Sequence, residues 1–232
     1  MKGKEFESSM VRRRFLARLG TGAGVIGATA ISAPAAVREA AADTQWRPAR
    51  HAQDDWFDAI PGQHRFVFDS TTADGMSWAL HFTSNYFAAN TDAYGLKDSD
   101  LAVVIVARHK STTFGYNDAM WAKYGQYLSE QAEFTDPKTK EPPTVNVYTS
   151  AGEGSAEASP IGALIAKGVH FAVCGMSTRT IAGRIAKGTG AKPDAIVKEI
   201  SANLISNSHL VPAGIVAVNR AQERGYSFVY AI

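Results

Sequence analysis

Hydrophobic residues follow two patterns along the chain, short continuous apolar runs and longer segments with apolar residues at helical spacing. Leu101 to Ala107 is the clearest strand, because an uninterrupted aliphatic run is typical of a parallel strand covered on both faces. Further strands are predicted at residues 64–69, 171–174, 210–211 and 227–232. Helices are predicted at residues 75–90, 117–130, 161–167, 179–188, 192–203 and 215–223.

This alternation predicts an α/β domain over residues 64–232, with a mostly parallel five-stranded sheet and helices on both faces. A Pro/Gly-rich excursion at 134–160 interrupts it, with a small strand predicted at Val145 to Tyr148. A polar, irregular arm at 43–63 precedes the domain. Its aromatic residues are expected to pack on the domain or on a neighbouring subunit; they are Trp46, Trp56 and Phe57.

The first 42 residues have the pattern of a twin-arginine signal peptide. Arg12, Arg13, Phe15 and Leu16 supply the export motif, although Val11 and Ala17 depart from its usual flanks. A mildly apolar Gly/Ala-rich stretch follows, too short for a stable membrane span, and then small residues suited to cleavage. Export to the periplasm is therefore predicted, and a disordered basic tail or a retained membrane anchor is the alternative.

The charge is unevenly distributed. Residues 1–42 carry seven basic and three acidic side chains, so their net charge of +4 leaves −2 for the remainder of a chain whose total is +2. A slightly acidic domain lacks the electrostatic footprint of nucleic-acid binding. The single cysteine excludes an internal disulfide.

That cysteine, Cys174, is predicted to end a strand that runs into a helix, which Ser177 or Thr178 is expected to cap. Chemistry in open α/β sheets gathers at the carboxyl ends of strands, and a helix N-terminus favours the thiolate. The alternative is that Cys174 is a small buried hydrophobe, as free cysteines commonly are.

A basic strand end follows residue 107, where Arg108 and His109 precede a run of hydroxyl residues. Together with Arg179 they are candidates for a pocket that holds an anion; the alternative is a solvated loop. The chain has no dinucleotide or P-loop glycine motif, no GxSxG elbow and no metal-ligand spacing among its histidines. No metal or other cofactor is therefore predicted, and Cys174 is the remaining candidate nucleophile.

The sequence resembles the DsrE/DsrF-like family of sulfur-relay and YchN-type proteins, closest to its exported branch. The resemblance covers roughly residues 64–232 and rests on Phe-Ala-Val-Cys-Gly-Met at 171–176 and on the segment from Val211 to Tyr226. It implies a three-layer α/β/α fold, assembly into trimers or hexamers, and a strand-end cysteine that carries persulfide sulfur. Only Cys174 carries over residue by residue.

Three hypotheses follow. In the first, Cys174 is a persulfide carrier that exchanges sulfur with donor and acceptor proteins. In the second, the chain is a non-catalytic oligomeric binding or scaffold protein. In the third, it is an accessory subunit of an exported redox complex, docked through the arm and the excursion.

Overall fold

The computed structural model describes residues 47–149 and 161–232. The predicted signal peptide, with Arg12, Arg13, Phe15 and Leu16, lies outside the described residues, as do Trp46 and positions 150–160 of the excursion. Residues 48–232 belong to one compact unit. The compact unit therefore includes most of the segment that we predicted as an arm.

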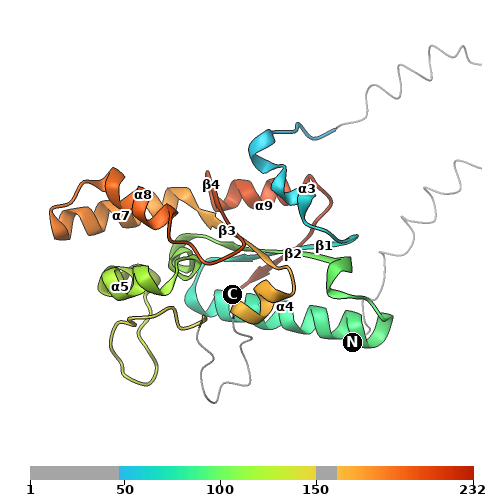
Figure 1. The fold of residues 1–232 in the computed structure, drawn as a ribbon, viewed down its shortest axis with the longest axis horizontal. Helices are drawn as coiled ribbons and strands as arrows, with labels where there is room; N and C mark the ends of the chain where they lie inside the picture. Colours follow the sequence, from blue (N-terminus) through green and yellow to red (C-terminus); the bar gives the residue numbers. More distant parts are fainter. Residues whose placement is uncertain (1–46, 150–160) are drawn as a thin grey trace, which may run out of the picture. The chain divides into compact units, whose positions relative to one another are not determined.

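The sheet has five parallel strands in the order β4-β3-β2-β1-β5 (Figure 1). Every residue of β2 is buried, as its continuous aliphatic sequence predicts. The five predicted strands are thus confirmed, as is the α/β class. Their bounds are β1 His64–Ser70, β2 Leu101–Ala107, β3 His170–Cys174, β4 Ser208–Val211 and β5 Ser227–Ala231.

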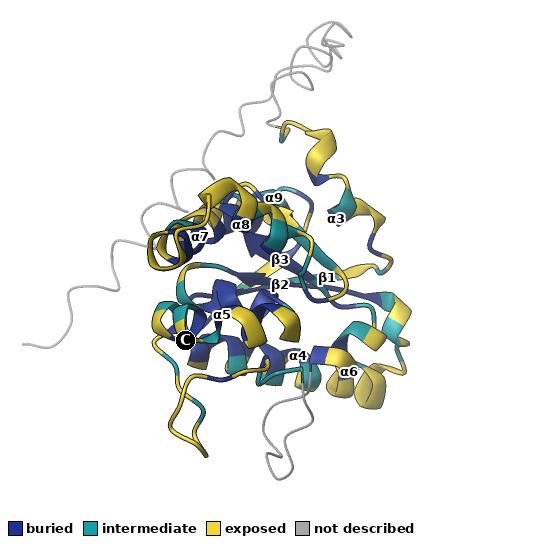
Figure 2. Ribbon diagram, turned by 60° about the vertical axis from the view of Figure 1, so that its left-hand side comes forward, coloured by how far each residue is buried: buried dark blue, intermediate teal, exposed yellow. Residues whose placement is uncertain are grey.

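Helices cover both faces of the sheet, which gives the three-layer α/β/α arrangement (Figure 1). One hydrophobic core lies between the sheet and a face covered mainly by α4, α5 and α7, and a smaller one lies under α3 and α9 (Figure 2). Among the described residues, no helix is long and apolar enough to cross a membrane. The α-helices are α3 Trp56–Ala59, α4 Ala73–Tyr94, α5 Asp118–Ala132, α6 Ile161–Ala166, α7 Gly175–Thr189, α8 Pro193–Ser201 and α9 Gly214–Gln222.

The strand register aligns the carboxyl ends of the strands. Ser70 pairs with Ala107, Ala107 with Val173, and Val173 with Leu210, so these residues form one line across the sheet. Arg108 and Cys174 each follow that line directly and therefore lie at the same edge. The topology places both predicted strand ends where ligands of open α/β sheets bind.

The small strand predicted at Val145 to Tyr148 is wrong, because the segment forms turns. Its polar side chains bind the surrounding backbone instead of a sheet edge. The fully buried Asn146 donates from Nδ2 to the carbonyls of Phe114 and Tyr116 at 2.8 and 2.9 Å. The Tyr148 hydroxyl donates to the carbonyl of Ala73 at 2.9 Å. These bonds hold the described part of the excursion against the domain.

Part of the predicted irregular arm is ordered as two short helical turns, a 3-10 turn at Ala52–Asp54 and α3. Phe57 is fully buried, and its carbonyl accepts a hydrogen bond of 2.8 Å from the hydroxyl of Tyr226. Arg224 Nε donates to Asp58 Oδ2 at 3.2 Å. Of the two alternatives for the described arm aromatics, the structure has them packed on their own domain.

Candidate functional site

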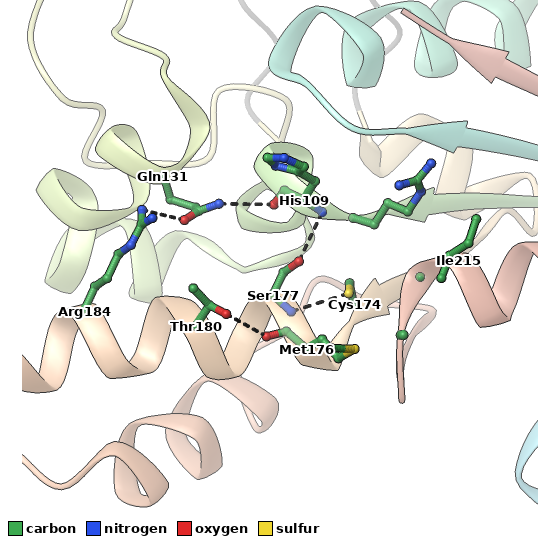
Figure 3. Close-up of a pocket in the computed structure, with 11 residues that line it drawn as sticks. His109, Gln131, Cys174, Met176, Ser177, Thr180, Arg184 and Ile215 are labelled. Carbon is green, nitrogen blue, oxygen red and sulfur yellow. Dashed lines mark hydrogen bonds between the residues drawn. The ribbon is translucent and has the colours of Figure 1, made fainter.

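A pocket of about 360 Å³ opens at the carboxyl edge of the sheet (Figure 3). Arg108 and His109, from the end of β2, line one side of it, and Cys174 lies at its floor. The first turns of α7 and α9 contribute the opposite wall, and Gln131 of α5 closes the rim. Three of the four predicted site residues therefore meet in one cavity.

Cys174 is 5% exposed and serves as the N-cap of α7. Its Sγ accepts the backbone N–H of Ser177 at 3.5 Å, the position that a capping oxygen usually takes. The prediction that Ser177 or Thr178 caps this helix is therefore wrong, and α7 begins at Gly175 instead of residue 179. Thr178 instead donates its hydroxyl to the carbonyl of Cys174 at 2.9 Å.

The electrostatics around the sulfur favour its charged form. Burial by itself raises the pKa of the Cys174 thiol, because a thiolate is poorly solvated there. Hydrogen bonds from the Ser177 hydroxyl and from the backbone N–H groups of Ser177, Gly214 and Met176 outweigh burial and lower the pKa below its ordinary value. Gly214 opens α9, so two helix N-termini point their free N–H groups at one sulfur.

His109 contributes to the site through its backbone. Its φ of 58° lies in the left-handed region, which His adopts more readily than bulky residues do. In that conformation its N–H donates to Ser177 Oγ at 3.2 Å, so the Ser177 hydroxyl hydrogen is left for the sulfur (Figure 3). The Gln131 side chain donates to the His109 carbonyl at 3.5 Å.

Arg108 lines the pocket, but its charge already has a partner. Its Nε and Nη2 donate to the two carboxylate oxygens of the buried Asp69 at 2.7 and 2.8 Å. The hydrogen bond to Asp69 raises the pKa of Arg108, which keeps the guanidinium charged. A Cβ on Gly214 would lie only 2.5 Å from Arg108 Cβ. The close approach of α9 to the Arg108–Asp69 pair therefore requires glycine at position 214.

The sequence prediction of Arg179 as a pocket residue is corrected, because the arginine of α7 that lines the pocket is Arg184. Counted from the true start of α7, the residues at helical spacing on the pocket face are Ser177, Thr180 and Arg184. Arg179 is exposed on another face of the helix. The helix start misplaced at residue 179 hid this spacing.

Arg184 supplies the pocket with a cation that no carboxylate neutralises. Its Nη1 donates to Gln131 Oε1 at 2.7 Å, and no Asp or Glu of the described residues forms an ion pair with it (Figure 3). Together with the two helix N-termini, Arg184 makes the pocket favourable for a negatively charged group. Exposed Met176 and Ile215 add apolar surface at the rim.

A second titratable cluster lies away from the pocket, and sequence spacing missed it. His170 Nδ1 and His209 Nε2 are 2.9 Å apart, and the ring of Trp56 stacks on His209 with centroids 3.8 Å apart. Burial lowers the pKa of both imidazoles, that of His209 to about 4. In the described part of the chain, no three His, Cys, Asp or Glu side chains are grouped as metal ligands.

Comparison with known proteins identifies no function for this chain. The sequence matches no protein-family model and no curated protein. One similar solved structure is that of MTH1491 from Methanobacterium thermoautotrophicum, a protein of unknown function. It is 15% identical with a TM-score of 0.35, over 72% of this chain and 99% of that chain. A likeness of this size carries no argument about function.

Proposed function

We propose that this chain is an exported DsrE-like sulfur carrier in which Cys174 holds persulfide sulfur. One observation carries the proposal: the only thiol lies at the floor of a pocket and has its pKa lowered by hydrogen bonds that overcome burial. Thiolate is the form that attacks sulfur, and a lower pKa also makes Cys174 a better leaving group. The resemblance at residues 171–176 supports the same assignment.

The transfer step exchanges one S–S bond for another. The Cys174 thiolate attacks the terminal sulfur of a donor persulfide, R–S–SH; the new bond forms at Sγ while the donor S–S bond breaks. The donor leaves as R–S⁻ with the bonding pair, and the proton stays on the transferred sulfur. An acceptor thiolate then attacks that sulfur and releases Cys174 as thiolate, so neither step consumes an oxidant or a reductant.

Burial gives the carrier selectivity. Because Cys174 is nearly inaccessible except through the pocket, two such thiols of neighbouring molecules cannot readily meet to form a disulfide. This protection is consistent with a lone cysteine in an oxidising compartment, where the predicted twin-arginine signal would deliver the chain. Export is tested by Arg12→Lys together with Arg13→Lys, which should leave the precursor in the cytoplasm.

Persulfide loading is tested by exposing the native protein to polysulfide and measuring its intact mass. The wild type is expected to gain whole sulfur atoms that a reducing agent removes. Cys174→Ser removes the attacking thiolate and should gain none, whereas Thr180→Ala should load like the wild type, because Thr180 lines the pocket without bonding the sulfur. A native wild type that gains no sulfur would overturn the carrier assignment.

Arg184 favours a second candidate, in which the pocket binds a small anion without covalent chemistry. The charge in this version comes from Arg184, since Arg108 is neutralised by Asp69 and Arg179 lies elsewhere. Calorimetry with sulfate or thiosulfate separates the two: binding that persists in Cys174→Ser but is lost in Arg184→Ala, without sulfur loading of the wild type, would favour it.

The third hypothesis, an accessory redox subunit, loses part of its basis. It used the arm aromatics for docking, whereas Phe57 is fully buried against its own domain and Trp56 stacks on Phe57 and His209. We therefore favour the carrier, in a homo-oligomer that meets separate donor and acceptor proteins.

A further inference from the structure

Strand β5 is an exposed edge of the sheet. It pairs with β1 on one side, and no described strand lies on its other side. Its sequence, Ser-Phe-Val-Tyr-Ala, contains no charged residue and no proline. Edge strands of soluble proteins usually carry such residues, because the free N–H and C=O groups of an unprotected edge pair readily with another chain.

The opposite edge strand, β4, is better protected against pairing with another chain. It is one residue shorter, and Pro212 follows it directly. His209 in its middle lies beneath the ring of Trp56. The two edges therefore differ in the features that oppose pairing, and β5 lacks all of them.

Aromatic side chains gather on both sides of β5. Val229 and Ala231 pack into the core on the α4 side of the sheet, so Phe228 and Tyr230, which alternate with them along the strand, share the opposite face. On the α4 side, Trp78 and Phe82 stack with ring centroids 5.4 Å apart. They lie three and seven residues after Gly75, where an added Cβ would be 2.5 Å from the Ala231 carbonyl, so this stripe flanks the edge.

The exposed side chains around β5 approach the area of a specific interface. The four aromatic side chains are 39–47% exposed, and Ile232 is 72% exposed. At 150–250 Å² for a full aromatic side chain, these five residues present roughly 500 Å² per copy. With the backbone of the edge strand added, this approaches the roughly 800 Å² per partner of a standard protein–protein interface.

We propose that β5 pairs antiparallel with β5 of a second copy, around a two-fold axis at Val229. This register pairs all five residues of the strand and places Phe228 opposite the partner's Tyr230, an aromatic cross-strand pair. On the α4 face it brings together the small side chains of Ser227, Val229 and Ala231, which leaves room for the two Trp78–Phe82 stripes. The edge carries no charge that would repel its own copy.

The two-fold constrains the assembly. A symmetric contact of this kind joins chains in pairs, so the number of chains per particle is even. Of the two assemblies that the family resemblance implies, a hexamer with dihedral symmetry contains such two-fold contacts and a cyclic trimer does not. This interface does not involve the sulfur site, because no residue of β5 or α4 lines the pocket.

Sedimentation equilibrium of the full chain tests the interface. The wild type is expected to contain an even number of chains, and Phe228→Lys should halve that number, because it buries a charge on each side of the axis. Leu210→Lys is the matched control, since Leu210 is 41% exposed on the other edge strand, and should sediment like the wild type. A monomeric or trimeric wild type, or a Phe228→Lys variant that sediments unchanged, would overturn the proposal.

Cross-linking tests the register without a destabilising charge. In a Cys174→Ser background, Val229→Cys meets the same residue of its partner at the axis, with Cα atoms about 4.5–5.5 Å apart, within disulfide reach. Mild oxidation should convert it to covalent dimers. Ser227→Cys, displaced from the axis, should not cross-link. The absence of cross-links at 229, or equal cross-linking at 227, would rule out this pairing.

Discussion

The two ends of β3 bury titratable groups with opposite results. At its start, burial lowers the pKa of His170 and of its neighbour His209, and repulsion from His170 lowers that of His209 further. At its end, burial raises the pKa of Cys174, but four hydrogen bonds reverse the shift. Desolvation and mutual repulsion thus favour the neutral form of the two imidazoles, whereas directed donors favour a charged sulfur.

The difference follows from the parallel topology. The carboxyl end of β3 runs directly into α7, and α9 begins beside it after β4, so free N–H groups converge there. At the start of β3 the two imidazoles meet each other and the ring of Trp56, and no backbone N–H of the described residues donates to either of them. The candidate site is the end at which backbone donors have no other partner.

The largest effect is expected from crowding the start of α9. Gly214→Ala places a Cβ 2.5 Å from Arg108 Cβ, so we expect a loss of about 1–3 kcal/mol in unfolding free energy and a higher thiol pKa. Urea denaturation and thiol titration measure both. Gly183→Ala in α7 is the matched control, because its Cβ meets open space; equal stability of the two variants would contradict the close approach.

Removing one donor from the sulfur is expected to act on reactivity more than on stability. Ser177→Ala deletes the hydroxyl hydrogen bond, so the pKa of Cys174 rises and less thiolate is present at neutral pH. Because thiolate is the form that reacts, alkylation at pH 7 should slow several-fold. Stopped-flow alkylation checks this against Thr180→Ala, and identical rates for the two variants would show that the Ser177 hydroxyl does not bond the sulfur.

Acid should lower the unfolding free energy through His209, beside the start of β3. The unfolded imidazole of His209 protonates near its ordinary pKa of 6.5, and the folded one only at about 4. Between these values the unfolded chain binds more protons, so stability falls as the pH drops through that window. Urea midpoints at several pH values measure the slope. His209→Gln should flatten it and His51→Gln should not; a slope that His209→Gln leaves intact would place its origin elsewhere.

The smallest change in stability is expected when the N-cap of α7 is replaced by serine. In Cys174→Ser, Oγ can accept the Ser177 N–H as Sγ does, so the unfolding free energy near neutral pH should stay within about 1 kcal/mol of the wild type. Because the folded thiol pKa lies below the ordinary 9.0, the wild type should gain relative stability as the pH rises toward that value. A relative loss of stability at alkaline pH would mean that the folded pKa is raised.

Patterns with strong periodicity predicted the fold well. The aliphatic run of β2 and the short apolar run before Cys174 identified strands that the structure confirms. The predicted strand at Val145 to Tyr148 failed because local periodicity cannot show that Asn146 bonds distant carbonyls. Hydrogen bonds to residues distant in sequence determine the conformation of that segment.

The site was predictable at Cys174 and less so around it. Position after a strand identified Cys174, Arg108 and His109, but not that Asp69 neutralises Arg108 or that His109 acts through its N–H. Arg184 was missed because a cysteine is an unusual N-cap, so the helix start was placed too late. Gln131 carries no local signal, since it reaches the pocket from another layer.

The most direct test of the account is a load-and-release measurement on one sample of native protein. The wild type is loaded with polysulfide, desalted, and mixed with a small thiol acceptor while its intact mass is followed. The account predicts that Cys174 gains sulfur and then returns to the unmodified mass as the acceptor becomes persulfidated. Sulfur that never attaches to the wild type, or attaches equally to Cys174→Ser, would contradict it.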